Sequence, residues 1–307
     1  MIVDVHTHLG KREYCAEGWW KAWTRTVATL VGRPVEKIWD RLPDFWNSTA
    51  EVLLQEMNEA HIDKSVLIGT DWGLGRFGDG EASFEQQNRD YAELARKYPD
   101  RIISVCGIDP RRKGAAEFLE RAVREWGMQG VKIHPVVGFY PNDSVVYPVY
   151  AKASELGIPV WIHTGPIICQ QSKFAQPIYC DDVALDFPDV NFILCHGGLW
   201  SWWAEAVGII AHKHNVYLDI SAWQGYAHRR PVEFFRTLRS MIDLAGPYRI
   251  LWGSDWPFLK TLVSQVKWVK LFQEPPSFVE EAGITFTEKE KKLMLGENFA
   301  RLMNLKP

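Results

Sequence analysis

The 307-residue sequence lacks a surplus of either charge, because 35 lysine and arginine residues stand against 38 aspartate and glutamate residues, a formal net charge of −3. A chain without basic excess cannot neutralise many phosphates, so we predict no nucleic-acid partner. Charged residues interrupt every apolar stretch well before the roughly 18 residues that a membrane-spanning helix needs. The opening segment MIVDVHTHLG has neither the basic nor the apolar region of a signal peptide. We therefore expect no membrane association and a cytoplasmic location.

The sequence also lacks paired cysteines: its five cysteines form no CxxC motif, which indicates free thiols in a reducing compartment. Hydrophobic residues make up 47% and charged residues 24%, close to globular averages, which excludes disorder and a coiled coil. Tryptophan is abundant instead, with 15 residues in the chain. Trp19, Trp20 and Trp23 lie close together, and such large side chains are seldom concentrated without a packing or stacking role.

Short β-branched runs alternate with amphipathic helical stretches along the whole chain. The expected strands are 2–6, 64–69, 101–107, 130–134, 158–163, 191–196, 215–220 and 249–255. The expected helices lie near 50–60, 84–98, 114–126, 147–156, 180–187, 200–213, 231–245, 264–272 and 287–303. This pattern predicts an α/β fold, a single (β/α)8 TIM barrel over residues 1–307. A doubly wound sheet is the alternative, but no Gly-rich phosphate loop follows the first strand.

The stretch 10–49 is far longer than an ordinary strand-to-helix connection of about 2–6 residues. It contains five tryptophans, so we interpret it as a Trp-rich insertion that forms a lid or a subunit contact. We accordingly predict a homodimer.

Polar residues gather where the expected strands end, which is the active-site face of a barrel. They are His6, His8, Lys132, His134, His163, His196 and Asp255. His6 and His8 lie two residues apart on an extended segment, so their side chains share a face. Together with His163 and Asp255 they would supply three nitrogen ligands and one oxygen ligand, which suits a divalent cation such as Zn²⁺.

The roles of His196 and Lys132 stay open. His196 precedes two glycines and is a core histidine, a general acid or base, or a second-metal ligand. Lys132 pairs with an anionic substrate, is carbamylated between two metals, or extends to the rim of the barrel. An arginine of the insertion, Arg25 or Arg33, is a further candidate for holding a substrate carboxylate. We expect Asp4 to be a strand-end or cap carboxylate, and support of a metal-bound histidine is its alternative role.

Aromatic side chains are candidates for the wall of an apolar pocket that accepts a planar substrate. We select Trp19, Tyr140 and Trp223 as substrate-binding residues, with Trp20 and Trp23 as further members of the wall. Packing on the outside of the barrel is the alternative role for each of them.

The set His6-x-His8, His163, His196 and Gly253-Ser254-Asp255-Trp256-Pro257 resembles the amidohydrolase superfamily. More narrowly, it is similar to the branch with aminocarboxymuconate semialdehyde decarboxylase, resorcylate decarboxylases and pyrone-dicarboxylate lactonases. The resemblance implies one divalent metal, usually Zn²⁺, held by His6, His8, His163 and Asp255, with His196 activating its water or donating a proton. The segment around Lys132 also resembles superfamily members in which this lysine is carbamylated between two metals.

We therefore expect a metal-dependent hydrolase that attacks a small carboxylated or cyclic substrate, a lactone or an amide, with a metal-activated water. Asp255 would accept the proton of that water, and His196 would stabilise the oxyanion or protonate the leaving group. Non-oxidative decarboxylation of an aromatic or enol acid at the same site is the main alternative. A non-catalytic binding barrel with a structural metal is a remote one.

Overall fold

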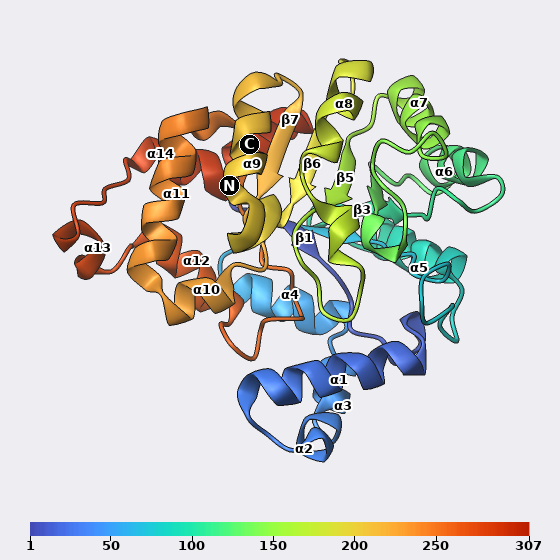
Figure 1. Cartoon of the computed structure of the whole chain (residues 1–307), viewed down its shortest axis with the longest axis horizontal. Helices are drawn as coiled ribbons and strands as arrows, with labels where there is room; N and C mark the ends of the chain where they lie inside the picture. The colour runs from blue at the N-terminus through green and yellow to red at the C-terminus, as the bar shows by residue number, and fades with distance from the viewer. Residues whose placement is uncertain (307) are drawn as a thin grey trace.

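The computed structural model describes residues 1–306, and its centre is one sheet of eight parallel strands in chain order (Figure 1). The strands are β1 (Val3–Thr7), β2 (Lys64–Ile68), β3 (Ile102–Gly107), β4 (Val131–Ile133), β5 (Val160–His163), β6 (Phe192–Cys195), β7 (Val216–Asp219) and β8 (Ile250–Leu251). After β8 the chain returns to β1, where Asp255 N donates to His6 O and Thr7 bridges Trp256. The predicted TIM barrel is therefore confirmed, with every expected strand in place.

Helices cover the outside of this barrel, as expected for parallel strands joined by crossovers. They are α4 (Ala50–Glu59), α5 (Phe84–Lys97), α6 (Ala115–Arg124), α7 (Tyr147–Leu156), α8 (Tyr179–Asp186), α9 (Leu199–His212), α10 (Gln224–Arg229), α11 (Pro231–Ala245), α12 (Gln265–Gln273), α13 (Ser277–Glu281), α14 (Glu288–Lys292) and α15 (Asn298–Leu302). Side-chain caps fix several starts: Ser83 Oγ accepts from Gln86 N at 3.1 Å, which begins α5. None of the helices formed by residues 1–306 combines the length and apolarity that a bilayer crossing requires.

The apolar core has two layers, one between strands and helices and one inside the barrel. The inner layer consists of Val3, Val5, Val66, Ile68, Ile103, Val105, Trp161, Ile193, Cys195, Leu251 and Phe299. Phe299 of α15 packs against Trp161, with 6.2 Å between ring centroids. The barrel interior is therefore packed. The candidate site residues lie beyond this layer, at the carboxyl ends of the strands.

A register irregularity in β1 turns the two histidines inward. Asp4 pairs with Ser65 and Thr7 with Leu67, so three residues of β1 span two of β2. Val5 points into the barrel below this extra residue. Because side chains alternate along a strand, one extra residue moves the next even-numbered residues to the inner face. His6 and His8 consequently point into the barrel mouth instead of the outer layer.

The segment 10–49 forms α1 (Glu17–Val31), α2 (Val35–Trp39) and α3 (Leu42–Trp46), which lie together at one end of the molecule (Figure 1). The ring of Trp19 packs on Trp72 at 4.8 Å and lies 6.4 Å from Phe258. Trp72 follows β2 and Phe258 follows β8, so this segment adjoins the carboxyl ends of the strands. That segment 10–49 acts as a lid or a subunit contact stays a prediction.

Candidate metal centre

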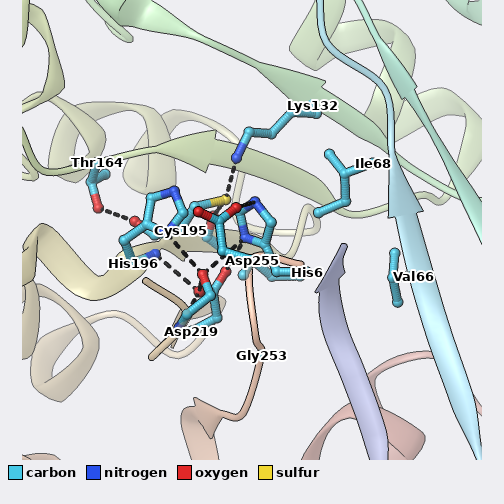
Figure 2. A network of polar contacts seen from close by, with 12 residues as sticks. His6, Val66, Ile68, Lys132, Thr164, Cys195, His196, Asp219, Gly253 and Asp255 are labelled. Atoms are coloured by element: carbon cyan, nitrogen blue, oxygen red, sulfur yellow. Dashed lines mark hydrogen bonds and ion pairs between the residues drawn. The ribbon is translucent and has the colours of Figure 1, made fainter. Parts of the chain in front are cut away.

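Three of the four predicted metal ligands converge at the barrel mouth. The ligand atoms of His6, His8 and Asp255 all lie within 4.8 Å of one another. An oxygen of Asp255 is 3.4 Å from His8 Nε2 and 3.7 Å from His6 Nε2. Figure 2 shows the carboxylate of Asp255 beside the ring of His6. Two imidazole nitrogens and one carboxylate oxygen in this arrangement suit a divalent cation.

The second nitrogen of each histidine is already engaged. His8 Nδ1 lies 2.8 Å from the carbonyl oxygen of Ile68, and His6 Nδ1 lies 3.0 Å from a carboxylate oxygen of Asp219. An Nδ1–H donated to these acceptors leaves Nε2 as a lone-pair donor facing Asp255. Metal-binding histidines are typically fixed by such partners, which set both the tautomer and the ring orientation.

His163, the fourth predicted ligand, stands outside this tight group. Its ring lies 4.8 Å from the ring of His196 and 5.7 Å from that of His134. Its Nε2 atom is buried and has no hydrogen-bond partner among the described residues. A buried polar atom without a partner is costly, and a cation would satisfy it. The donor set therefore fits a metal, with His163 on the side of His196.

Asp219 connects His6 to His196. Besides His6 Nδ1, its carboxylate accepts the backbone N–H of His196 at 3.0 Å and the hydroxyl of Ser221. The Ser221 Oγ in turn lies 2.8 Å from His196 Nδ1 (Figure 2 shows Asp219 and His196). Asp219 is the most connected carboxylate of the site, and we did not select it from the sequence. Its signal was a carboxylate as the last residue of an otherwise apolar strand.

Asp4 is a strand-end carboxylate: it accepts the backbone N–H of His6 at 3.3 Å and does not contact an imidazole ring. Its carboxylate accepts Ser254 N at 2.9 Å, Ser254 Oγ at 2.5 Å and Gln265 Nε2 at 3.0 Å. It therefore fixes the segment before Asp255, and Asp219 contacts the ring of His6 instead.

Burial keeps the histidines of the site neutral. It lowers the pKa of His6 and His196 well below the ordinary value, and that of His163 to about 3, with positive charge nearby adding to the effect. Burial raises the pKa of Asp255, against the hydrogen bond and charge of His8 and the charge of Lys132. Neutral imidazoles are the form that binds metal, so no proton has to be displaced from them near pH 7.

The backbone is strained at this mouth. Four residues other than glycine that follow β6, β7 and β8 have positive φ: His196 (63°), Leu199 (51°), Ala222 (64°) and Asp255 (56°). Such conformations cost free energy and cluster at functional sites, where surrounding contacts hold them. The strain aims His196 and Asp255 inward from the ends of their strands.

The predicted substrate-binding residues lie in different surroundings. Lys132 is fully buried inside the barrel, where its Nζ donates to Cys195 Sγ at 2.7 Å. Trp223 is buried in the outer core, and its indole N–H donates to the carbonyl of His196 at 2.8 Å. Tyr140 packs on Phe174 and Tyr179.

Trp19 lines a small pocket with Trp72 and Phe77, and this pocket has room for about one water molecule (about 20 Å³). Arg25 and Arg33 are exposed on the insertion, and neither side chain is inside the barrel mouth. An arginine contact to a substrate carboxylate, considered above for these two, is therefore not supported.

The family model described as Amidohydrolase matches residues 3–305, so the chain belongs to the amidohydrolase family. This membership confirms the resemblance and the prediction of a metal-dependent hydrolase or carboxy-lyase. No curated protein matches the chain.

Solved structures share its fold over nearly their whole length. One is a 5-carboxyvanillate decarboxylase from Sphingomonas paucimobilis (16% identity, 99% of both chains, TM-score 0.67). Another is a dihydroxybenzoic acid decarboxylase from Polaromonas sp. JS666 with bound manganese (18% identity, 99% of this chain and 97% of that chain, TM-score 0.64). A third is a probable 2-pyrone-4,6-dicarboxylic acid hydrolase from Acinetobacter baumannii (15% identity, 99% of both chains, TM-score 0.64). Both decarboxylation and hydrolysis are thus compatible with this fold.

Proposed function

We propose that this chain is a metal-dependent hydrolase that opens the lactone or amide bond of a small, planar, carboxylated substrate. The observation that carries the proposal is the convergence of His6 Nε2, His8 Nε2 and a carboxylate oxygen of Asp255 on one point. Each ring is held from behind by a separate acceptor, which a purely structural packing of histidines does not require.

The site would hold one cation, Zn²⁺ by the preference of its nitrogen and oxygen donors, on His6, His8, Asp255 and His163. A second ion, joined to the first by a carbamylated Lys132, is not favoured, because the Nζ of Lys132 is hydrogen-bonded to Cys195 Sγ. When bound, such a cation lowers the pKa of water and polarises a carbonyl group.

The side chains divide the proton transfers between them. Asp255, whose pKa is raised by burial, accepts the proton of the attacking water at a carboxylate oxygen. His196 faces the developing charge with Nε2, because its Nδ1 is occupied by Ser221. Asp219 holds Ser221 and the backbone N–H of His196, so the ring is oriented before substrate arrives.

Aromatic rings around the mouth favour a flat substrate. Phe258 lies edge-on to His8 at 5.7 Å, and Trp72 lies edge-on to His134 at 5.6 Å. Trp19 contacts both aromatic residues, so a planar ring entering between them would stack on apolar faces. Lys132 is the cation that we assign to the carboxylate of the substrate, for which its Nζ would exchange the hydrogen bond to Cys195 Sγ for one to the carboxylate.

Decarboxylation of an aromatic acid is the second candidate, favoured by the same aromatic wall and by the decarboxylases among the solved structures. Asp255 would then be the group that transfers a proton to the ring carbon, since its carboxylate lies beside His6 and His8 at the proposed metal site.

A substrate panel with metal analysis tests both candidates. The enzyme would be loaded with Zn²⁺ or Mn²⁺ and incubated with lactones and amides of carboxylated rings and with hydroxylated benzoates. Ring opening without CO₂ release supports hydrolysis, and CO₂ release supports the second candidate. His6→Ala should lose bound metal and turnover, whereas His214→Ala, an exposed site far along the chain, should keep both. Full metal content and turnover in His6→Ala would refute the assigned centre.

We also propose that the chain forms a homodimer through its insertion. Leu30 and Val31, at the end of α1, are 57% and 52% exposed, and neighbouring exposed apolar residues often mark a contact surface. Light scattering after size exclusion should give twice the mass of the chain, and Leu30→Asp should reduce it to one chain.

A further inference from the structure

The interior of the barrel contains the side-chain amine of Lys132. Lys132 lies in the middle of β4, paired with Gly107 of β3 and Trp161 of β5, and is completely buried. Among residues 1–306 its Nζ forms no ion pair with a carboxylate, and its one hydrogen-bond partner is the Sγ of Cys195 in β6. Burying a lysine is costly without a charged partner, so this pair needs an explanation.

The separation of the two atoms is too short for an ordinary hydrogen bond. Nζ and Sγ lie 2.7 Å apart (Figure 2). An N–H···O bond is usually about 2.9–3.0 Å long, and sulfur is larger than oxygen, so an N–H···S contact should be longer still. The separation is also far too long for a direct nitrogen–sulfur bond. It suits two atoms that are both bonded to one small atom between them.

We propose that Lys132 and Cys195 form a reversible covalent N–O–S crosslink when dioxygen is present. The thiol and the amine each lose one hydrogen, sulfur and nitrogen are each oxidised by two electrons, and dioxygen is reduced by four. One of its oxygen atoms becomes the bridge, and the other leaves as water with the two hydrogens. Four equivalents of an added thiol reverse the reaction, giving the free amine, the free cysteine, one water and two disulfides.

The pair is arranged for this step. Among residues 1–306, Lys132 is the one amine that is hydrogen-bonded to the thiol of Cys195. Its charge and hydrogen bond lower the pKa of Cys195, against the larger effect of burial, which raises that pKa. Both groups are fully buried in the barrel, which keeps bulky oxidants away from them, and dioxygen is small and apolar. Cys106 of β3 is equally buried but packs in the outer layer, and no lysine donates to it, which makes it a matched control.

The crosslink has a consequence at the mouth of the barrel. Cys195 is followed directly by His196, so the bridge joins β4 to the strand that carries the proposed acid. It also withholds the Nζ of Lys132 from any substrate carboxylate. Oxidised protein should therefore bind carboxylated substrates more weakly than reduced protein, a consequence that rests on the proposed function, whereas the crosslink itself does not.

Intact mass spectrometry of the full chain tests the crosslink without any assay of activity. Protein equilibrated with air should be heavier by about 14 Da, one oxygen gained and two hydrogens lost, than protein reduced under argon. Proteolysis should yield a joined pair of peptides containing Lys132 and Cys195, which separates on addition of dithiothreitol. Lys132→Met and Cys195→Ala should abolish the shift, and Cys106→Ala should retain it.

Several results would overturn the crosslink. These are no mass change in air, addition of one or more oxygens to Cys195 without a joined peptide, or a loss of about 2 Da, which denotes a direct sulfur–nitrogen bond. The wild-type measurement decides even if a variant does not fold. If the crosslink forms while substrate binding is unaffected by reduction, the proposed contact between Lys132 and substrate fails and the crosslink stands.

Discussion

Replacing Asp219 by asparagine is the sharpest perturbation of the candidate centre. The carboxylate accepts four contacts: His6 Nδ1, the backbone N–H groups of His196 and Ser221 at 3.0 Å each, and the hydroxyl of Ser221. Asparagine has the same shape but offers one oxygen and one amide N–H₂. One of the groups that now donate to Asp219 must then lie against the amide N–H₂, which is itself a donor. The negative charge beside His6 Nδ1 is also lost.

The size of the effect follows from this arrangement. Loss of an outer partner of a metal-bound histidine typically reduces metal affinity or activity about 10–100-fold. That is about 1.4–2.7 kcal/mol, since each factor of ten corresponds to about 1.4 kcal/mol. We expect Asp219→Asn to be near the upper end for turnover, because Asp219 orients His196 as well as His6.

The assay is a competition titration of Zn²⁺ against a chelator of known affinity, followed by turnover at saturating metal. Asp109→Asn is the control: Asp109 is as buried, but its carboxylate bonds Arg111 and not a histidine. The control should keep the affinity of the unaltered protein. If Asp219→Asn kept a Zn²⁺ affinity and a turnover within twofold of those of the unaltered protein, the idea that this carboxylate organises the site would be refuted.

Three further outcomes follow from the structure. A Cβ at Gly253 would lie 3.0 Å from His6 Cβ, so Gly253→Ala should weaken metal binding about tenfold in the same titration, whereas Gly208→Ala, with open space around its Cβ, should not. Burial raises the pKa of Asp4 to about 7 from 3.8, so the folded state holds this proton more tightly than the unfolded chain. The free energy of unfolding in urea should accordingly fall between about pH 4 and 7, and Asp4→Asn should flatten that fall; an unchanged slope would contradict it. Trp19→Ala should raise KM for a planar substrate about tenfold and leave bound metal unchanged, and lost metal would show that the ring supports the centre itself.

The barrel could be predicted because its signals are local. Each strand is a short apolar run, and some helices begin at a side-chain cap, as α5 does at Ser83. The irregularity of β1 could not be predicted, because it depends on how Asp4 and Thr7 pair with a strand about 60 residues away. The expectation that His6 and His8 share a face holds on either register; only the register decides that this face is the inner one.

The convergence of His6, His8 and Asp255 could be predicted from the sequence, and the residues that support them could not. His6, His8 and Asp255 could be selected because chemistry-bearing residues at strand ends share one edge of a barrel. Asp219 was missed because its value lies in its contacts with His6 and Ser221, which no spacing encodes. Asp4 was expected mainly as a strand-end carboxylate, and its contacts with Ser254 and with the backbone N–H of His6 agree with that interpretation.

The contacts of the site also indicate that the protein folds before it binds metal. His6 and His163 are buried with lowered pKa values, so they enter the core without charge. Burying neutral imidazoles costs far less than burying imidazolium ions, and the interior layer of the barrel is complete without a cation. A structural zinc site behaves differently, because the fold depends on the ion. Removal of metal by a chelator should thus abolish turnover, while the free energy of unfolding falls only by the free energy of metal binding. Unfolding of the protein on chelation would assign the ion a structural role instead.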